Sequence, residues 1–349
     1  MGIKIEKITV SKINSIDFNH LPFGKVFTDH MFECDFVDGK WQQPLIKPYG
    51  PLQLDPSARV FHYGQAVFEG MKAYKDDHGA IFLFRPQENF LRINISSKRL
   101  AIPEFPETYF FEGLRTLLQL EKDWIKKGRG NSLYIRPLVI ATESAISASP
   151  SNAYKFMIIC SPAQSYYEEE VRVLFSEKYS RSADGGIGFA KAAGNYSTQF
   201  YPTNLANKEG FQQIVWTDAS THKYVEEAGT MNIFFRINDL LITPPVSDRI
   251  LDGVTRKSVI QLAKDNDMEI EIRKVSVSEI KEAAKSGSLK EIFGSGTAAV
   301  INPIVGFKHG EETFELFKTE DSYARFFKQK LTDIQYNTGS DIHSWRYKI

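Results

Sequence analysis

Cysteine is scarce in this chain. Only Cys34 and Cys160 occur among the 349 residues, and they stand far apart. Two distant cysteines provide neither the paired spacing of a zinc site nor the framework of a disulfide-stapled domain. We therefore expect no metal site, and the low cysteine content favours a reducing, cytoplasmic setting.

The chain also lacks an excess of one charge and lacks long hydrophobic runs. Lys plus Arg and Asp plus Glu each number 43, so the formal net charge is zero and the sequence pI is about 7.1. A nucleic-acid-binding surface built on bulk charge is therefore not expected, which leaves room for a local positive pocket. Residues 1–10 hold no signal-peptide core, and no later run reaches the length of a membrane span. Neither a nucleic acid nor a membrane is an expected partner.

Apolar residues are abundant enough for a large packed core. Hydrophobic residues make up 42% and aromatic residues 13% of the chain, which excludes general disorder, and the length suggests about two domains. Pro86 opens a predicted helix, because its missing N–H is not needed in a first turn. The first half is expected to hold strands at 25–36, 68–75, 80–84, 133–141 and 154–160, and helices from residue 86 and at 107–127.

The composition changes after Cys160, where a Ser-Pro-Ala-Gln-Ser run followed by glutamates indicates a connector. The second half is richer in short strands, which makes the chain α+β. A small N-terminal α/β domain is expected at 1–163, a connector at 164–184 and a larger C-terminal domain at 185–349. The expected elements are strands at 171–175, 213–217, 223–226, 232–237 and 240–243, and helices near 198–208, 255–265, 276–285 and 319–336.

One lysine stands in an unusual sequence setting. Lys191 lies in the run GFAKAAGNY at 188–196, among small and apolar residues and with no acid beside it in sequence. Burial of an amine disfavours its charged form and frees it to attack a carbonyl, and small neighbours let a flat ligand approach the backbone. Lys191 is therefore a candidate nucleophile; the alternative is a glycine-rich turn with an incidental lysine.

A nucleophilic lysine suits a Schiff base either with a substrate or with pyridoxal phosphate. The cofactor demands an anion seat for its phosphate and a carboxylate that keeps its ring nitrogen protonated. Glu227 is a candidate carboxylate because it enters a small-residue turn ahead of an apolar strand; a solvated strand end is the alternative. Arg92, on the first long helix, offers bidentate contact to a phosphate, unless it is an ordinary solvated helix arginine.

Two small-residue turns offer further anion seats. The run GVTR at 253–256 precedes a helix, where N–H groups and the positive end of the dipole favour an anion; an ordinary turn into a helix is the alternative. The run GSGTA at 294–298 offers hydroxyls and amides that can form a backbone nest. Each signal is weak alone, but each supplies a different part that one cofactor needs.

Several separated runs resemble one family in sequence and in order. They are YGQAVFEGMKAY at 63–74, FRP at 84–86, YIRP at 134–137, KAAGNY at 191–196, EAGTMN at 227–232 and GSGTA at 294–298. In this order they resemble the branched-chain amino-acid aminotransferases, which are class IV aminotransferases and fold-type IV pyridoxal phosphate enzymes. The resemblance spans roughly residues 25–305. It implies a two-domain fold with a small α/β domain and a larger strand-rich pseudobarrel domain that carries Lys191.

The resemblance assigns roles at the implied cofactor, pyridoxal 5′-phosphate. Lys191 would hold it as a Schiff base and later move the proton between the substrate Cα and the cofactor. Glu227 would pair with the ring nitrogen, and Tyr196 would hydrogen-bond the ring oxygen O3′. Further cofactor contacts would come from Arg92, Thr230, Val254, Thr255 and Thr297.

The resemblance also assigns substrate contacts. Arg136, oriented with Tyr134, would take the side-chain carboxylate of glutamate, and Phe68 with Tyr134 would shape a pocket for leucine, isoleucine or valine. The implied reaction is reversible transfer of the amino group between these L-amino acids and 2-oxoglutarate. The α-carboxylate would contact Tyr63, Thr297 and Ala298.

A homodimer follows from the same resemblance, because Tyr63 and a loop near Ile146 reach into the partner subunit in this family. Ala193 departs from the family pattern, since many relatives have glycine there. No Cys-x-x-Cys pair follows Ala298, so the redox switch of some animal members has no basis here. Two alternatives stay open: a D-amino-acid or aromatic aminotransferase of the same fold, and a cofactor-free homologue that serves as an oligomeric binding protein.

Overall fold

The computed structural model describes residues 2–164, 171–317 and 319–349. By their contacts, the residues form two compact units. Unit 1 is Met1–Tyr166, Ala190–Ala193 and Asp333–Ile349, and unit 2 is Tyr167–Phe189 and Gly194–Thr332. This grouping differs from the expected domains at 1–163 and 185–349, because Lys191 and the C-terminal residues 333–349 lie with unit 1.

Unit 1 is built on a ten-stranded sheet in the order β1-β4-β2-β9-β8-β6-β7-β19, with β3 beside β2 and β5 beside β8. Buried and partly exposed residues alternate along β8, as expected for a strand that faces a core on one side. The strands are β1 (Lys4–Ile5), β2 (His30–Val37), β3 (Lys40–Trp41), β4 (Leu45–Pro48), β5 (Ala66–Phe68), β6 (Met71–Lys75), β7 (Ile81–Phe84), β8 (Ser132–Ala141), β9 (Tyr154–Ala163) and β19 (Arg346–Lys348).

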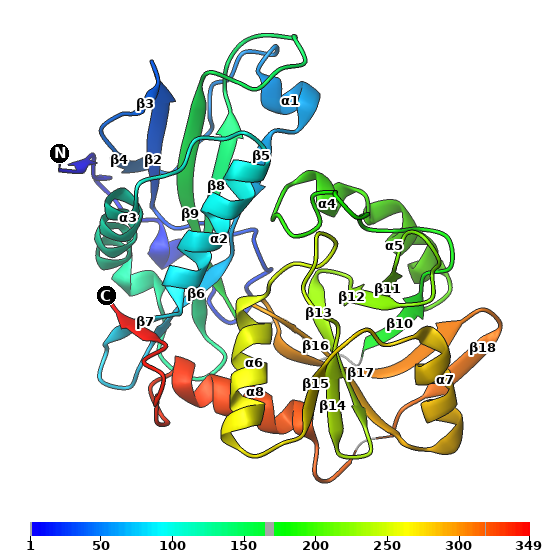
Figure 1. Ribbon diagram of the computed structural model, residues 1–349. Coiled ribbons are helices and arrows are strands. Elements are labelled where there is room, and N and C mark those ends of the chain that lie inside the picture. The colour runs from blue at the N-terminus through cyan, green and yellow to red at the C-terminus, as the bar shows by residue number, and fades with distance from the viewer. Residues whose placement is uncertain (1, 165–170, 318) are drawn as a thin grey trace. The chain divides into compact units, whose positions relative to one another are not determined.

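Helices α2 (Pro86–Arg99) and α3 (Glu107–Leu120) pack on the sheet of unit 1, beside β5 and β2 respectively (Figure 1). Proline opens α2, with an acidic residue in its first turn and basic residues in its last, which suits the helix dipole. A five-residue helix, α1 (Arg59–Tyr63), precedes β5. Short 3-10 helices occur at Ile13–Ser15 and Lys122–Trp124.

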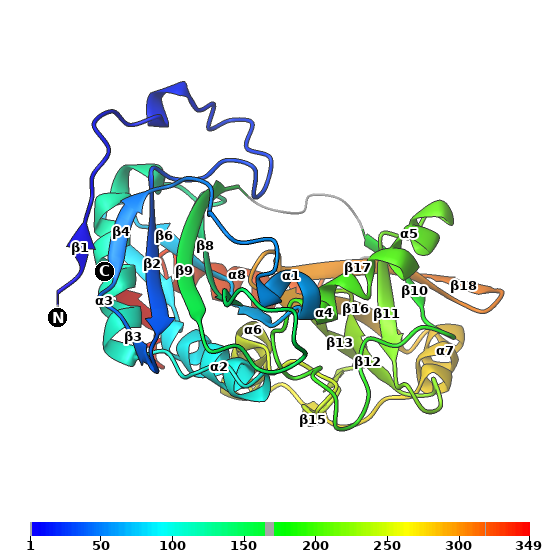
Figure 2. The same ribbon diagram turned by 90° about the horizontal axis from the view of Figure 1, so that it is seen from above.

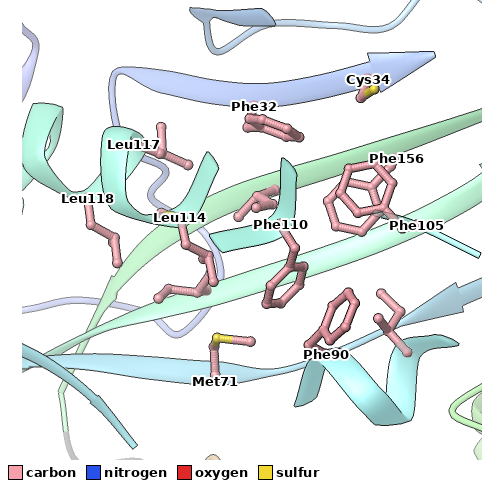
Figure 3. Close-up of a cluster of buried hydrophobic side chains, with 14 of the residues drawn as sticks. Phe32, Cys34, Met71, Phe90, Phe105, Phe110, Leu114, Leu117, Leu118 and Phe156 are labelled. Carbon is pink, nitrogen blue, oxygen red and sulfur yellow. The ribbon is translucent and has the colours of Figure 1, made fainter. Parts of the chain in front are cut away.

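Aromatic rings fill the space between α3 and the sheet of unit 1 (Figure 3). Phe105 and Phe156 stack with centroids 3.7 Å apart, and Phe32 meets both rings edge-on. Each of the three residues is at most 1% exposed. Gly113 of α3 faces this cluster, and a Cβ placed on it would lie 2.6 Å from a ring carbon of Phe32.

Unit 2 holds a nine-stranded sheet that closes on itself. The order β12-β11-β10-β17-β16-β13-β14-β15 includes an additional pairing of β12 with β13, so the strands from β12 round to β13 form a ring (Figure 2). This confirms the α+β class and the barrel-like second half. The strands are β10 (Val171–Phe175), β11 (Gln213–Thr217), β12 (Val225–Ala228), β13 (Met231–Ile237), β14 (Leu240–Thr243), β15 (Ile270–Ile272), β16 (Leu289–Gly296), β17 (Val300–His309) and β18 (Glu312–Glu315).

Among the helices of unit 2, α5 packs against β11, and both α6 and α7 pack against β16. Ser276 caps α7 by accepting a hydrogen bond from the Glu279 N–H, and Gly287 ends it in the left-handed conformation. The bounds are α4 (Gly194–Ser197), α5 (Phe200–Lys208), α6 (Val254–Asp265), α7 (Val277–Ser286) and α8 (Tyr323–Gln335).

Both cysteines are free and buried. Burial raises the pKa of Cys34 to about 12, and it also raises the pKa of Cys160. Within the described ranges, no cluster of His, Cys, Asp and Glu is placed to hold a metal ion. Among the same residues, no helix combines the length and apolar character that a membrane crossing requires.

Several predicted boundaries are wrong for identifiable reasons. The strand expected from residue 25 begins at His30, because the Asp29 carboxylate binds Ser11 and Trp124 at the end of the preceding loop. The helix expected to run to residue 127 ends at Leu120, where the buried Glu121 side chain turns away to accept the Asp29 N–H. The strand expected at 223–226 is β12, shifted to Val225–Ala228.

We predict that Gly113→Ala lowers the free energy of unfolding by about 1–3 kcal/mol, because the new methyl group overpacks a ring that cannot move away. Helix propensity alone predicts the opposite effect, an increase of roughly 1 kcal/mol in the free energy of unfolding. Urea unfolding followed by tryptophan fluorescence measures the shift.

Gly50→Ala is the matched control, since no heavy atom lies within 4 Å of a Cβ placed on Gly50. Its unfolding midpoint should stay near that of the wild type. A Gly113→Ala protein as stable as the wild type would contradict the packing described for α3.

Candidate active site

The backbone around Lys191 is bonded to β5 and α2, although it lies far from both in sequence. The Phe68 N–H donates to the Lys191 carbonyl at 3.0 Å, and the Ala193 N–H donates to the Ala66 carbonyl at 3.0 Å. The Lys191 N–H donates to Ser96 Oγ, on α2, at 2.9 Å. These bonds fix the main chain of Lys191 on both sides, so unit 1 carries this lysine.

The side chains of Lys191, Phe68, Tyr134 and Arg136 form a group that we call the lysine cluster. Lys191 Nζ lies 4.9 Å from the centroid of the Phe68 ring, and Arg136 Cζ lies 4.5 Å from the same centroid. Arg136 Nη2 donates to Tyr134 Oη at 2.9 Å. One apolar ring therefore contacts both an amine and a guanidinium, and the expected contact of Arg136 with Tyr134 is present.

Gly70 makes room for the Tyr134 hydroxyl in this cluster. A Cβ placed on Gly70 would lie 2.2 Å from Tyr134 Oη, which is far inside a van der Waals contact. Gly70 belongs to the FEGMK run quoted above, but its steric role was not predicted. Residue type alone could not show it, because the contact depends on the pairing of β6 with β8.

Arg92 is buried, so the solvated-helix alternative is wrong. Its Nε donates to Glu69 Oε1 at 2.6 Å and its Nη2 to Glu69 Oε2 at 2.9 Å, in a two-pronged pair. Glu69 is fully buried and also accepts from Asn89 Nδ2 at 2.8 Å. Burial opposes ionisation of Glu69, but Arg92 and the charge of Lys191 outweigh it and lower its pKa. Lys191 thus has an acidic neighbour in space that the sequence reasoning missed.

Tyr63 lies on a different part of unit 1, at the end of α1. Its side chain is exposed, and its hydroxyl donates to the Ile146 carbonyl. Gly64 ends α1 in the left-handed conformation, at φ 61°. Tyr63 is therefore bonded to the loop near Ile146 within one chain, a contact that was not predicted.

Glu227 lies inside β12 and is 3% exposed, so the solvated-strand-end alternative is wrong. Its Oε1 accepts from Asn232 Nδ2 at 3.0 Å and from the Leu251 N–H at 3.2 Å. Its Oε2 lies 3.0 Å from Arg181 Nη1. Arg181 was missed, because it stands in a stretch of mixed polar residues with no regular spacing.

In unit 2, the strand register places polar residues side by side on neighbouring strands, beginning with Glu227. Glu227 faces Asn232 across β12 and β13, and Asn232 faces Ser295 across β13 and β16. Ser295 Oγ is buried and, among the described residues, has no hydrogen-bond partner. Residues 294–296, expected to lie in a turn, belong to β16, and the turn follows at 297–299 with Thr297 and Ala298, both of them partly exposed.

The start of α6 adjoins the same row. Gly253 is the N-cap and no side chain caps the helix, so its first N–H groups are left to other partners. A Cβ placed on Gly253 would lie 1.9 Å from Asn232 Oδ1. Asn232 thus lies between the predicted carboxylate, Glu227, and the predicted phosphate seat at Val254 and Thr255.

Two further predicted residues of unit 2 are Tyr196, partly exposed on α4, and Thr230, exposed beside Gly229.

Glu226 is a second buried carboxylate, next to Glu227 in β12, that the sequence reasoning did not select. Burial raises its pKa to about 7, although Arg249 binds it and opposes the shift. Its Oε2 is buried without a hydrogen-bond partner among the described residues. A carboxylate in this setting changes its protonation near neutral pH.

We predict that Glu226 makes stability fall as pH rises. Its folded pKa of about 7 lies above the ordinary 4.5, so its contribution is complete below the ordinary value and lost as pH passes the folded value. Glu226→Gln keeps an acceptor for Arg249 but cannot ionise. The wild type should therefore lose stability relative to Glu226→Gln between roughly pH 5 and 8, as measured by urea unfolding at a series of pH values. If the stability of the two proteins changed with pH in the same way, the raised pKa of Glu226 would be contradicted.

Comparison with known proteins gives consistent matches. The sequence pattern of the family described as amino-transferase class IV matches residues 66–306. The chain is 43% identical to "Branched-chain-amino-acid aminotransferase 2" of Bacillus subtilis, over 99% of this chain and 97% of that one. It is 42% identical to the "Branched-chain-amino-acid aminotransferase" of Mycolicibacterium smegmatis, over 94% and 92%.

Solved structures share the fold at lower sequence identity. The branched-chain aminotransferase of Thermoproteus uzoniensis with norvaline aligns with a TM-score of 0.75 and 22% identity, covering 90% of this chain and 98% of that one. The holo-form from Thermobaculum terrenum, described as the PLP-form, aligns with a TM-score of 0.74 and 21% identity, covering 92% and 98%. These likenesses confirm the fold expected from the motifs.

Proposed function

This chain belongs to the class IV aminotransferases and, within them, to the branched-chain amino-acid aminotransferases, and on that premise we propose that it moves the amino group reversibly between L-leucine, L-isoleucine or L-valine and 2-oxoglutarate. Membership of this family, predicted from the separated motifs, is confirmed by the matches above. The enzyme is a transaminase. The proposed substrates rest on one observation in the lysine cluster.

That observation is the position of the Phe68 ring, which contacts both Lys191 Nζ and the Arg136 guanidinium. A transaminase must accept an aliphatic side chain and a side-chain carboxylate in turn, in one pocket. An aromatic ring packs against the aliphatic group, and a guanidinium that lies over that ring and is bonded to Tyr134 pairs with the carboxylate. The same pocket can then serve both substrates.

The residues fit pyridoxal 5′-phosphate as the cofactor. Unit 2 offers a buried carboxylate, an uncapped helix start and the orphaned Ser295 hydroxyl, and Asn232 neighbours all three. When bound, the cofactor supplies an aldehyde for the amino group and a ring that withdraws electrons. Lys191 Nζ would bind the aldehyde carbon and later carry the proton at the substrate Cα. Glu227, fixed by Asn232 and Arg181, would hold the proton on the ring nitrogen.

The other assigned residues position the ligands. Arg92, oriented by Glu69, would bind the phosphate together with the amides of Val254 and Thr255. We also propose that Tyr196, Thr230 and Thr297 contact the cofactor, and that the substrate α-carboxylate contacts Tyr63, Thr297 and Ala298.

We further propose a homodimer in which Tyr63 completes the site of a second copy. Tyr63, Phe61 and Ile146 are exposed, at 45%, 62% and 70%, and exposed apolar side chains that gather on one surface are typical of an interface. A cytoplasmic setting is proposed because both cysteines are free thiols.

We predict that Lys191→Ala abolishes turnover. Loss of the group that transfers the proton should lower kcat by at least about a hundredfold, and the protein should no longer become yellow with pyridoxal phosphate. A coupled assay with L-leucine and 2-oxoglutarate measures the first effect. Lys208→Ala, at an exposed position of α5, should behave as the wild type, and an active Lys191→Ala enzyme would overturn the proposal.

We predict that Arg136→Met separates the two substrates. Loss of a charge-assisted hydrogen bond should raise the KM for 2-oxoglutarate by about tenfold or more. The half-reaction with L-leucine should change little, because the pocket keeps its apolar ring. Equal losses for both substrates would show that Arg136 does not discriminate between them.

A donor panel addresses the alternatives left open by the sequence. L-Leucine should react faster than L-phenylalanine and D-alanine. Preference for D-alanine would favour a D-amino-acid aminotransferase, and preference for L-phenylalanine an aromatic one. Failure of all donors in protein saturated with cofactor would favour a binding protein.

A further inference from the structure

Arg59 is a buried arginine of unit 1 that no role described so far explains. It stands in the short helix α1, and its side chain is 5% exposed. Its Nη1 donates to the carbonyls of Ser147 at 3.0 Å and Pro150 at 3.3 Å, and also to the carbonyl of Ser149. Its Nη2 donates to Ser147 Oγ at 3.0 Å, and its Nε lies 3.2 Å from Glu143 Oε2. One guanidinium thus contacts several residues of the loop at 143–150.

The side chains of this loop contribute little apolar packing that would hold its shape. Its sequence is rich in serine and alanine, and its one large apolar side chain, Ile146, is exposed rather than packed. Backbone carbonyls that turn inward need donors, and the guanidinium offers five N–H groups in a fixed fork. Lysine has only one nitrogen, so it cannot contact Ser147 Oγ and Glu143 as well, as Nη2 and Nε of Arg59 do.

The loop and helix α1 are joined at further points. The Arg59 N–H donates to the Glu143 carbonyl at 3.0 Å, and the Ala145 N–H donates to the Ser57 carbonyl at 3.1 Å. At the far end, the Tyr63 hydroxyl donates to the Ile146 carbonyl. Residues 57–63 and 143–150 therefore form one element, which we call the Arg59 element.

The two sides of this element differ in character. Arg59 is buried beneath it, whereas Phe61, Tyr63 and Ile146 are exposed on it. Under the proposed function, Tyr63 and Ile146 are the residues that reach a second copy of this chain. Their positions relative to each other depend on the loop conformation, and Arg59 provides several of the hydrogen bonds that hold the loop.

We propose that Arg59 is a positioning residue for substrate binding, acting through Tyr63 and Ile146 on the site of a second copy of the chain. The inference rests on the proposed function. Arg59 does not touch the substrate, so it should affect how well the α-carboxylate is bound more than the rate of proton transfer.

The test compares Arg59→Lys with the wild type as holoenzymes. Arg59→Lys keeps the charge but loses the fork, so the KM for L-leucine should rise about tenfold while kcat stays within about twofold. Arg129→Lys is the matched control, because Arg129 also uses its guanidinium in unit 1, on Asp333 and Thr338, but lies away from the Arg59 element. An unchanged KM, or a loss confined to kcat, would overturn the inference.

A double-mutant cycle with Tyr63→Phe shows whether Arg59 acts through Tyr63. If it does, adding Arg59→Lys to Tyr63→Phe should raise the KM by less than it does in the wild type. Full additivity would overturn the inference. If Arg59→Lys fails to fold, Ser149→Ala, which removes one acceptor 2.6 Å from Nη1, should raise the KM by a smaller factor of about threefold.

Limited proteolysis separates this inference from the proposed function. Cleavage within 143–150 should be faster in Arg59→Lys than in the wild type and in Arg129→Lys. A wild-type enzyme with no activity toward branched-chain substrates would overturn the proposed function, while the cleavage rates would still report whether Arg59 holds the loop. Equal cleavage rates would overturn the inference whatever the activity.

Discussion

The attachment of residues 190–193 to β5 is the constraint on which the proposed site depends. The hydrogen bonds between Phe68 and Lys191 and between Ala193 and Ala66 make this short segment an added edge of the sheet in unit 1. Ser96 fixes the same main chain from α2. Because the backbone is held on two sides, the Lys191 side chain starts from a defined point, beside the Phe68 ring and within the field of Glu69. Small residues around Lys191 are needed for this close pairing as much as for access by a ligand.

Buried carboxylates paired with arginines recur in both units. Glu69 pairs with Arg92 in unit 1, and Glu227 pairs with Arg181 in unit 2. A buried ion pair gives little net stability, but removal of one partner leaves an uncompensated charge and costs about 3–5 kcal/mol. Such pairs therefore fix side-chain positions more than they stabilise the fold. In each pair one member was predicted to contact the cofactor, and the other holds it in place.

The sequence predicted the elements with strong local signals and missed residues defined only by distant contacts. Helix α2 begins at Pro86 as expected, and β10 has the expected bounds. Strand β16 was not predicted, because its run to Gly296 ends in the glycine-rich turn that attracted attention for another reason. Lys191 and Glu227 could be selected because each stands beside small residues in an informative run. Arg181 and Arg59 have no such run, and only the folded contacts reveal them.

The local distribution of charge is consistent with the proposed binding of anions by a chain of zero net charge. Lys191, Arg92 and Arg136 lie in unit 1 with Glu69 as the buried carboxylate that pairs with Arg92. Together these four groups carry more positive than negative charge when Lys191 is protonated, so an anionic ligand compensates them. Phosphates and carboxylates are such ligands, and apolar surroundings strengthen the attraction because the local dielectric is low. The neutral average of the whole sequence thus conceals a positive site.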